Sequence, residues 1–260
     1  MKPTDEVLDV LKQVKPQYVA DGWITTMPQV DRNLYIAVNK VIECLGGKWN
    51  RKAKAHVWTE DPNEPLAIVV ATGEVTDWKK DFQFFETPGD VVDRMIHRAG
   101  LNSEMSILEP SAGLGAILSG IMYQAGLRRT MAVEINPKMA RDLNNRFWRT
   151  GMITRERDFL TCGSELGRFD RILMNPPFSR GQDIAHVAHA WEMLKSGGRL
   201  VAITSPGWEF RTDSKHCRFR DWLTCLPKTI IENLPEGTFK SSGTNVRAKL
   251  ITLNKPEGQQ

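Results

Sequence analysis

A junction between a predicted strand and a loop carries the residues best suited to chemistry in this chain. The apolar run at 172–174 predicts a buried strand, and Asn175, Pro176, Pro177 and Phe178 follow it directly. Ligands of open α/β sheets bind at the carboxyl ends of strands. There the Asn175 carboxamide oxygen and the Pro176 carbonyl can accept hydrogen bonds from a planar amine while Phe178 stacks on its ring. The quartet predicts work on an exocyclic amino group; a proline-stopped loop with a core phenylalanine is the alternative.

A glycine-rich turn forms the second candidate site. The segment Glu109-Pro110-Ser111-Ala112-Gly113-Leu114-Gly115 lies between a predicted strand and a predicted helix. Glycines at such a turn let a ligand approach the backbone closely. Leu118 occupies the third glycine position of the dinucleotide fingerprint G-x-G-x-x-G, which disfavours a pyrophosphate site.

Acidic residues follow the next two predicted strands. Glu134 stands 19 residues after Gly115 (134 − 115), close to the spacing of about 20 at which an acid binds ribose hydroxyls. Asp158 and Phe159 add a carboxylate and a ring at the same sheet edge, suited to an adenine amino group and its face. Each acid alone is typical of an ordinary loop. As an ordered series on successive strand ends, they favour a ligand site.

The elements that position these residues alternate between strand and helix from Gly89 onward. The predicted strands are 105–108, 130–135, 153–157, 171–174, 199–204, 229–233 and 247–253, and the predicted helices are 90–99, 116–124, 137–148 and 182–194. This order predicts an α/β fold, a doubly wound, mostly parallel seven-stranded sheet with helices on both faces. The wide gap between Thr204 and Thr229 leaves room for a functional insertion.

Residues 1 to about 80 are expected to form a small α+β module, followed by a catalytic domain over 81–260. Thr4 or Asp5 can cap a helix through Val14, and Asp31 can cap a second helix that Gly46-Gly47 ends. The apolar run 66–70 predicts a strand.

Charge is mildly positive overall, with a formal net charge of +4, and it is concentrated in two clusters. Basic residues interleaved with aromatic ones are what phosphate contact and base stacking use, although each cluster alone fits a solvated basic face. The first cluster comprises Lys48, Trp49, Arg51, Lys52, Lys54 and His56, and the second comprises Arg211, Lys215, His216, Arg218 and Arg220.

Composition favours a soluble globular protein. No apolar run approaches the roughly 20 residues that span a bilayer, and the polar start is unlike a signal peptide, so we expect a cytoplasmic location. The 4 cysteines contain no Cys-x-x-Cys pair, which argues against zinc and for reduced structural thiols.

Taken together, the motifs resemble those of the S-adenosylmethionine-dependent adenine-N6 DNA methyltransferases of bacteria and phages, over Phe84 to about Asn254. The segment Phe84-Phe85-Glu86-Thr87-Pro88 resembles the cofactor-contacting segment before the first helix of that family, and 109–115 resembles its main cofactor loop. The turn 194–200 resembles the entry to its fifth strand. The amino-terminal segment 46–52 looks like the leading segment of some phage-borne adenine methyltransferases.

The resemblance implies methyl transfer from S-adenosylmethionine to the N6 amine of adenine in DNA, with no metal. It implies cofactor-binding roles for Phe85, Thr87, Pro88, Glu109, Pro110, Ser111, Ala112, Gly113, Gly115, Glu134, Asp158, Phe159 and Asn175. It makes Asn175, Pro176, Pro177 and Phe178 catalytic. Restriction protection, regulation and evasion of host nucleases are all compatible roles.

Two features of the pattern leave more than one function open. Many relatives carry a large target-recognition domain, whereas this chain ends soon after its last predicted strand, so recognition is expected to be minimal or to come from residues 1–80 or from the loops at 211–220 and 237–245. The same quartet also serves amino methyltransferases of RNA bases or of a translation-factor glutamine. A module that only binds nucleic acid is a third possibility.

Overall fold

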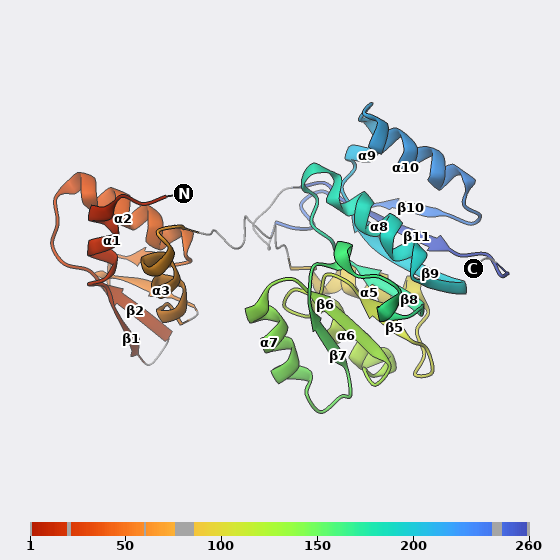
Figure 1. The fold of residues 1–260 in the computed structure, drawn as a ribbon, viewed down its shortest axis with the longest axis horizontal. Coiled ribbons are helices and arrows are strands. Elements are labelled where there is room, and N and C mark those ends of the chain that lie inside the picture. Colours follow the sequence, from red (N-terminus) through yellow and green to blue (C-terminus); the bar gives the residue numbers. More distant parts are fainter. Residues whose placement is uncertain (1, 20–21, 60, 76–85, 241–245, 259–260) are drawn as a thin grey trace. The chain divides into compact units, whose positions relative to one another are not determined.

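The computed structural model describes residues 2–19, 22–59, 61–75, 86–240 and 246–258. The chain divides into two compact units, unit 1 over residues 1–81 and unit 2 over residues 82–260 (Figure 1). None of the described helices combines the length and apolar character that crossing a membrane requires. All 4 cysteines are free.

Unit 1 packs helices against an antiparallel sheet. The strands β1 (Lys15–Val19), β2 (Gly22–Thr26), β3 (Lys48–Asn50) and β4 (Ala55–Trp58) lie in the order β1-β2-β4-β3. The helices are α1 (Asp5–Leu11), α2 (Arg32–Cys44) and α3 (Asn63–Thr72). Their apolar residues, including the fully buried Val38 and Ile42, form one core with Trp58, whose indole Nε1 donates to Thr25 Oγ1 at 2.9 Å.

Helix ends in unit 1 follow the expected chemistry. Thr4 caps α1, and the Asp31 carboxylate caps α2 by accepting from the N–H groups of Asn33 and Leu34. Gly47 lies so close to the core that an added Cβ would come within 2.6 Å of Ile42 Cγ2, which explains a glycine there. The helix α1 ends at Leu11, three residues earlier than expected.

The strand expected at residues 66–70 is wrong, because these residues lie within the helix α3. A short apolar run does not by itself distinguish a buried strand from a buried helix. Here Leu66 and Val69, three positions apart, both turn toward the core of unit 1, as helical periodicity requires.

Unit 2 contains the seven-stranded, mostly parallel sheet, so the predicted fold class is confirmed. The strand order is β10-β11-β9-β8-β5-β6-β7. The strands are β5 (Ile107–Glu109), β6 (Thr130–Glu134), β7 (Ile153–Glu156), β8 (Phe169–Met174), β9 (Leu194–Thr204), β10 (Ile230–Asn233) and β11 (Lys249–Asn254). The strand β11 runs antiparallel to both of its neighbours, and the remaining neighbours pair in parallel.

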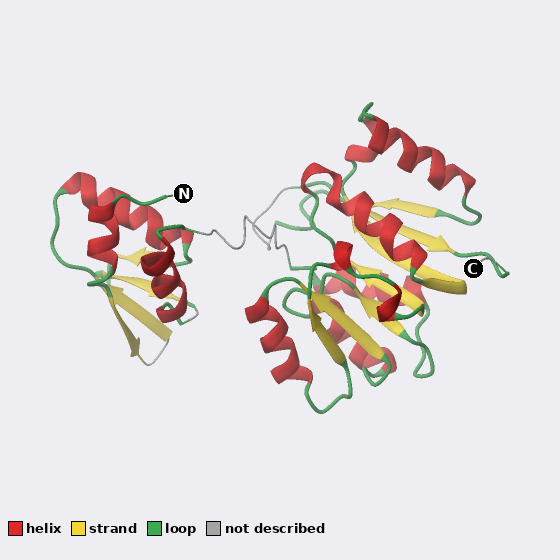
Figure 2. Ribbon diagram, viewed as in Figure 1, coloured by secondary structure: helices red, strands yellow, loops and turns green. Residues whose placement is uncertain are grey.

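Helices cover both faces of this sheet (Figure 2). The helices α5 (Gly89–Ala99), α6 (Ala116–Ala125) and α7 (Pro137–Phe147) contribute to one core, and α8 (Gln182–Glu192) and α10 (Ser214–Cys225) contribute to the other. Strand β8 serves both cores, since Leu173 packs in the first while Ile172 and Met174 pack in the second.

The insertion expected between Thr204 and Thr229 is wrong. The short helix α9 (Gly207–Phe210) and the helix α10 fill this stretch, and α10 is the crossover helix between β9 and β10. Its Phe219 and Leu223 are buried, and the Phe219 ring meets the rings of Trp208 and Trp222 at about 5.7 and 5.6 Å. Helix α10 is therefore part of the sheet's cover.

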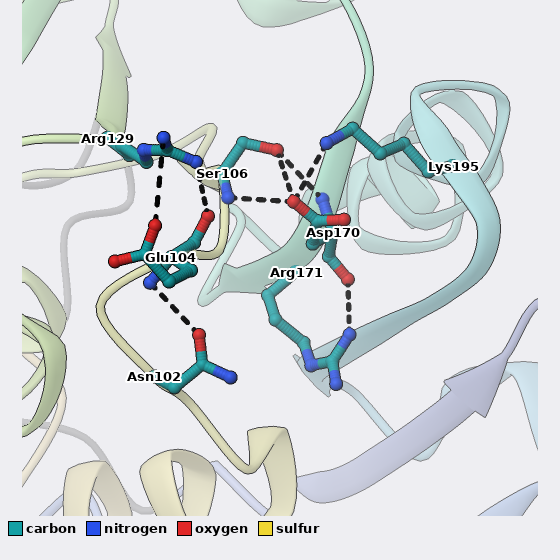
Figure 3. A network of polar contacts seen from close by, with 7 residues as sticks. All are labelled: Asn102, Glu104, Ser106, Arg129, Asp170, Arg171 and Lys195. Carbon is teal, nitrogen blue, oxygen red and sulfur yellow. Dashed lines mark hydrogen bonds and ion pairs between the residues drawn. The ribbon is translucent and has the colours of Figure 1, made fainter.

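A polar network ties the amino ends of the central strands together (Figure 3). The Asp170 carboxylate, on β8, accepts from Ser106 N–H at 2.8 Å, from Ser106 Oγ at 2.7 Å and from Lys195 Nζ at 2.8 Å. Burial raises the pKa of Asp170, but the hydrogen bonds from Lys195 and Ser106 outweigh it and leave the pKa below its ordinary 3.8. The charged form of Asp170 therefore stabilises the fold.

Replacing Asp170 with Ala should lower the free energy of unfolding by about 1–3 kcal/mol, because Ser106 N–H and Lys195 lose their acceptor. The loss should be present above pH 3.8 and shrink below it, since the wild-type carboxyl is then protonated. Denaturant unfolding of the full chain measures it. Glu104→Ala is the matched control, because Glu104 is exposed and its ion pair with Arg129 is long, at 3.7 Å, so it should contribute little to stability. An equal loss of stability in Glu104→Ala would contradict the assignment.

Candidate active site

The strand order reverses between β5 and β8, and this reversal defines the candidate site. From β5 the chain continues through β6 to β7 on one side, while β8 leads to β9 on the other. Crossover loops diverge at such a point and leave a crevice at the carboxyl ends of the two strands. The glycine loop 109–115 follows β5, and the Asn175 quartet follows β8. The two motifs identified from sequence therefore lie on the two sides of this reversal of strand order, which is called the switch point.

The glycine loop has a backbone that side chains disfavour. Gly113 and Gly115 have φ angles of 53° and 80°, in the left-handed region. A Cβ at Gly115 would also come within 2.8 Å of Leu143 Cδ2. Gly113 N–H donates to Glu134 Oε2 at 2.7 Å, and Ala112 N–H donates to the Val133 carbonyl at 3.1 Å. The loop is thereby attached to the end of β6.

Arg146, on α7, is a supporting residue that the sequence reasoning missed. Its guanidinium donates to the Leu114 carbonyl at 3.0 Å and to Ser119 Oγ at 2.9 Å, so it joins the glycine loop to the first turn of α6. The guanidinium also lies 5.0 Å from the ring centroid of Phe147. An arginine on the polar side of a helix gives no local sign of such a contact.

Two acids with raised pKa values lie at this edge. Burial raises the pKa of Glu134, although backbone N–H groups of Asn136 and Gly113 oppose the shift. Burial, reinforced by the Glu134 charge, raises the pKa of Glu109 well above its ordinary 4.5. Glu109 is only 1% exposed, and its Oε2 has no hydrogen-bond partner among the described residues.

The buried Glu109 side chain bears on one sequence-based expectation. The enclosed carboxyl group does not face solvent, so a contact between Glu109 and a cofactor stays a prediction. Glu109 is the last residue of β5, directly before the rest of the glycine loop.

Asn175 is oriented by a residue far away in the chain. Its carboxamide Nδ2 donates to Thr87 Oγ1 at 3.0 Å. Thr87 is buried, and Pro88 after it is the N-cap residue of α5. This bond joins the segment before α5 to the end of β8 and sets which way the carboxamide points. Pro176 is buried, and Phe178 is half-buried against the core beneath α5 and α6.

Asp158 and Phe159 lie past β7, and the two side chains differ in their surroundings. The Asp158 carboxylate caps the short 3-10 turn 159–161 by accepting from Leu160 N–H at 3.0 Å. The Phe159 ring is 2% exposed and packs 4.8 Å from His189 and 5.6 Å from His186, centroid to centroid. The predicted stacking of this ring on a cofactor is wrong, because the ring is part of the core.

Exposed apolar side chains at the same edge were also missed. Leu114, Ile135 and Leu160 are 36%, 47% and 37% exposed and come after β5, β6 and β7, which are adjacent in the sheet. Apolar side chains facing solvent beside a glycine loop suit the flat face of a ring. The signal available in the sequence was the apolar residue directly after Glu134.

The second basic cluster divides in the structure. Lys215 Nζ donates to the Arg180 carbonyl at 2.5 Å, which brings α10 against the loop that follows Phe178. Arg211 and Arg218 are exposed. Arg220 donates to the carbonyls of Trp208 and Arg211 at 2.5 and 2.7 Å, and its role in nucleic-acid binding stays a prediction. His216 is buried and bonded to Asp213.

The first basic cluster of the sequence lies in unit 1. Lys48, Trp49, Arg51, Lys52 and Lys54 are all exposed there. Phe85 lies outside the described residues. Within the described ranges, no group of three or more His, Cys, Asp or Glu side chains could hold a metal ion.

Comparisons with known proteins place this sheet among methyltransferase folds. The structure of a type I restriction-modification methyltransferase subunit from Streptococcus thermophilus matches with a TM-score of 0.55 and 19% identity, covering 68% of this chain and 45% of that one. A dimethyladenosine transferase from Plasmodium falciparum matches with a TM-score of 0.52 and 16% identity, covering 66% and 62%. These matches establish the Rossmann-like methyltransferase fold.

A known protein is similar to this chain in sequence over part of its length. The chain is 24% identical over 168 residues to the "Probable ribosomal RNA small subunit methyltransferase A" of Methanosarcina barkeri, covering 59% of this chain. The match spans 56% of that relative's length. No protein-family model matches.

The raised pKa of Glu109 predicts a pH-dependent stability. The native state keeps the Glu109 proton to higher pH than the unfolded chain does, so the free energy of unfolding should fall as pH rises from 4.5 through the native pKa. Glu109→Gln should flatten this fall, measured as the difference between unfolding midpoints at about pH 5 and pH 8. Glu156→Gln, an exposed acid on β7, is the control. An unchanged slope in Glu109→Gln would rule out this source.

Proposed function

We propose that unit 2 transfers a methyl group from S-adenosylmethionine to the exocyclic N6 amine of adenine in DNA. The observation that carries the proposal is the orientation of the Asn175 carboxamide, whose Nδ2 donates to Thr87 Oγ1. Asn175 follows β8, on the other side of the switch point from the glycine loop. The methyltransferase fold supports the cofactor, and the likeness to a restriction-modification methyltransferase subunit supports the DNA substrate.

The glycine loop and its surroundings fit such a cofactor. Left-handed Gly113 and Gly115 allow close approach to the backbone, and Glu134 offers a carboxylate at the spacing suited to ribose hydroxyls. The exposed Ile135 and Leu160 offer apolar contacts for an adenine face. Thr87, Pro88, Pro110, Ser111, Ala112 and Asp158 complete the proposed set. When bound, S-adenosylmethionine supplies an electrophilic methyl group.

The quartet after β8 holds and activates the target amine. Asn175 Oδ1 and the Pro176 carbonyl accept the two amino hydrogens, which localises the nitrogen lone pair, while Pro177 stiffens the turn and Phe178 stacks on the base. On methyl transfer, the C–N bond would form as the methyl–sulfur bond of the cofactor breaks and its thioether leaves. These acceptors would stabilise the positive charge growing on nitrogen, and one proton would then leave to solvent. Positioning supplies much of the rate.

The target base must leave its stack to enter this crevice. In the α9–α10 region, Lys215 contacts the loop after Phe178. The same region carries the exposed Arg211 and Arg218. Cations beside that loop suit the phosphates flanking an extruded nucleotide.

An RNA base is the second candidate substrate, favoured by the match to a ribosomal RNA methyltransferase. A translation-factor glutamine would instead make the target a protein, and a module that only binds nucleic acid would transfer no methyl group. Transfer of a radiolabelled methyl group, measured separately on DNA, RNA and protein, distinguishes these functions. Mapping of modified bases in DNA from cells expressing the protein then identifies the atom and sequence context.

Asn175→Ala should abolish measurable methyl transfer or lower it by about a hundredfold, because the target amine loses one polar acceptor. Cofactor affinity, measured by calorimetry, should change little. Thr87→Val should lower the rate less, since it removes the hydroxyl that accepts from Asn175 Nδ2 but leaves the Asn175 carboxamide oxygen in place. Turnover close to wild type in Asn175→Ala would refute the proposed catalytic role.

Gly113→Leu should weaken S-adenosylmethionine binding by more than about tenfold, because φ of 53° disfavours a branched side chain and the added atoms obstruct the loop. Calorimetric titration measures the affinity. Gly126→Leu is the control, since Gly126 also has a positive φ, of 73°, but lies after α6, at the end opposite the glycine loop. Equal affinity in Gly113→Leu and wild type would place the cofactor elsewhere.

A further inference from the structure

The β3–β4 hairpin of unit 1, residues 48–58, concentrates positive charge on its surface. Lys48, Arg51, Lys52 and Lys54 are exposed, and the hairpin contains no Asp or Glu. None of the four forms an ion pair with a described acid. By contrast, Lys2 and Lys12 of the same unit pair with Glu74 and Asp9 at 3.2 and 2.7 Å.

Local hydrogen bonds close the turn that carries Arg51, Lys52 and Lys54. Asn50 Oδ1 accepts from the N–H groups of Lys52 and Ala53 at 2.9 and 3.1 Å, closing a local turn. Lys54 follows with a left-handed φ of 48°. The strand β3 lies at the edge of the sheet, where only β4 pairs with it among the described strands. The cations of the turn therefore lie on a backbone with its own local hydrogen bonds.

Trp49 adds an aromatic surface on the face of β3 opposite to Lys48, because side chains alternate along a strand and Trp49 pairs with His56 whereas Lys48 pairs with Val57. Its side chain is 44% exposed, and its ring is braced by Tyr35 of α2 at 6.3 Å and by His56 of β4 at 5.1 Å, with interplanar angles of 87° and 65°. A ring already held by its neighbours loses little conformational freedom when a ligand stacks on it.

His56 supports this surface without adding charge. It is 1% exposed, its Nε2 lies 2.7 Å from Asn39 Oδ1, and its buried Nδ1 has no partner among the described residues. Burial lowers its pKa, and the Glu43 charge opposes this only in part. The sequence-based inclusion of His56 among the cations is therefore wrong, and the ring serves as packing for Trp49.

We propose that this hairpin binds a single strand of nucleic acid, with Trp49 stacking on an unpaired base and the cations of the turn, Arg51, Lys52 and Lys54, contacting its phosphates. A braced aromatic ring among cations is the combination that single-strand binding uses. A duplex offers the phosphates but no open base face within its stack, so Trp49 selects the unpaired strand. The site belongs to unit 1 alone and is independent of methyl transfer by unit 2.

The test measures binding of the full chain to fluorescein-labelled probes of about 20 nucleotides, made of oligothymidine, oligouridine or a duplex, across a range of salt concentrations. Arg51→Gln/Lys52→Gln should weaken single-strand binding and reduce the slope of log affinity against log salt by about 1.4, or about 0.7 per lost contact. Lys2→Gln/Lys12→Gln changes the net charge equally and should leave the slope unchanged. Equal effects of the two double variants would overturn the proposal.

Trp49→Leu tests stacking separately. It should weaken single-strand binding at least about fivefold and leave duplex binding unchanged, since stacking on one base contributes about 1–3 kcal/mol. Circular dichroism verifies folding, and Ile36→Ala, another exposed apolar residue of unit 1, is the control. Unchanged single-strand binding in Trp49→Leu overturns the proposal. The thymidine and uridine probes separate DNA from RNA, and the variants keep Asn175, so methyl transfer can fail or succeed independently.

Discussion

The reversal of strand order between β5 and β8 is the constraint on which the candidate site depends. Parallel neighbours bring their carboxyl ends to one edge, and the divergence of the crossovers opens that edge between two particular strands. Residues 109–115 and 175–178 are far apart in the chain, yet they follow these two strands directly. The buried centres of β5 and β8 hold the two loops in place, because any shift of register would expose apolar side chains.

Polar groups at that edge are held at an energetic cost. Burial raises the pKa values of Glu109 and Glu134, which means that the fold opposes their ionisation. Glu134 is compensated by N–H groups from the glycine loop and from Asn136, whereas one Glu109 oxygen is buried without a partner in the described part of the chain. Shifted pKa values of buried acids are typical of sites organised for a ligand. Arg146 and Thr87 add hydrogen bonds that hold the loop and the Asn175 carboxamide in position.

The two units have different roles in the proposed functions. Unit 2 combines the cofactor loop, the amine-binding quartet and the cations beside it. Unit 1 presents exposed cations on a hydrogen-bonded hairpin, together with a tryptophan packed against Tyr35 and His56. Charge in both units gathers on surfaces, and such surfaces favour a polyanionic partner whose affinity falls with salt. His56 shows that a basic residue of the sequence pattern can be buried in the fold and so add no charge to such a surface.

The sequence by itself determined the α/β class, the seven strands of unit 2 and the order of the motifs, because apolar period and turn residues are local signals. It did not separate a strand from a helix at 66–70, where a short apolar run fits both. Tertiary structure alone decided that Glu109 and Phe159 are enclosed, that Arg220 bonds to carbonyls and that Thr87 orients Asn175, 88 residues away. Burial and hydrogen-bond partners arise from segments distant in the chain, and no local pattern encodes which distant group will arrive.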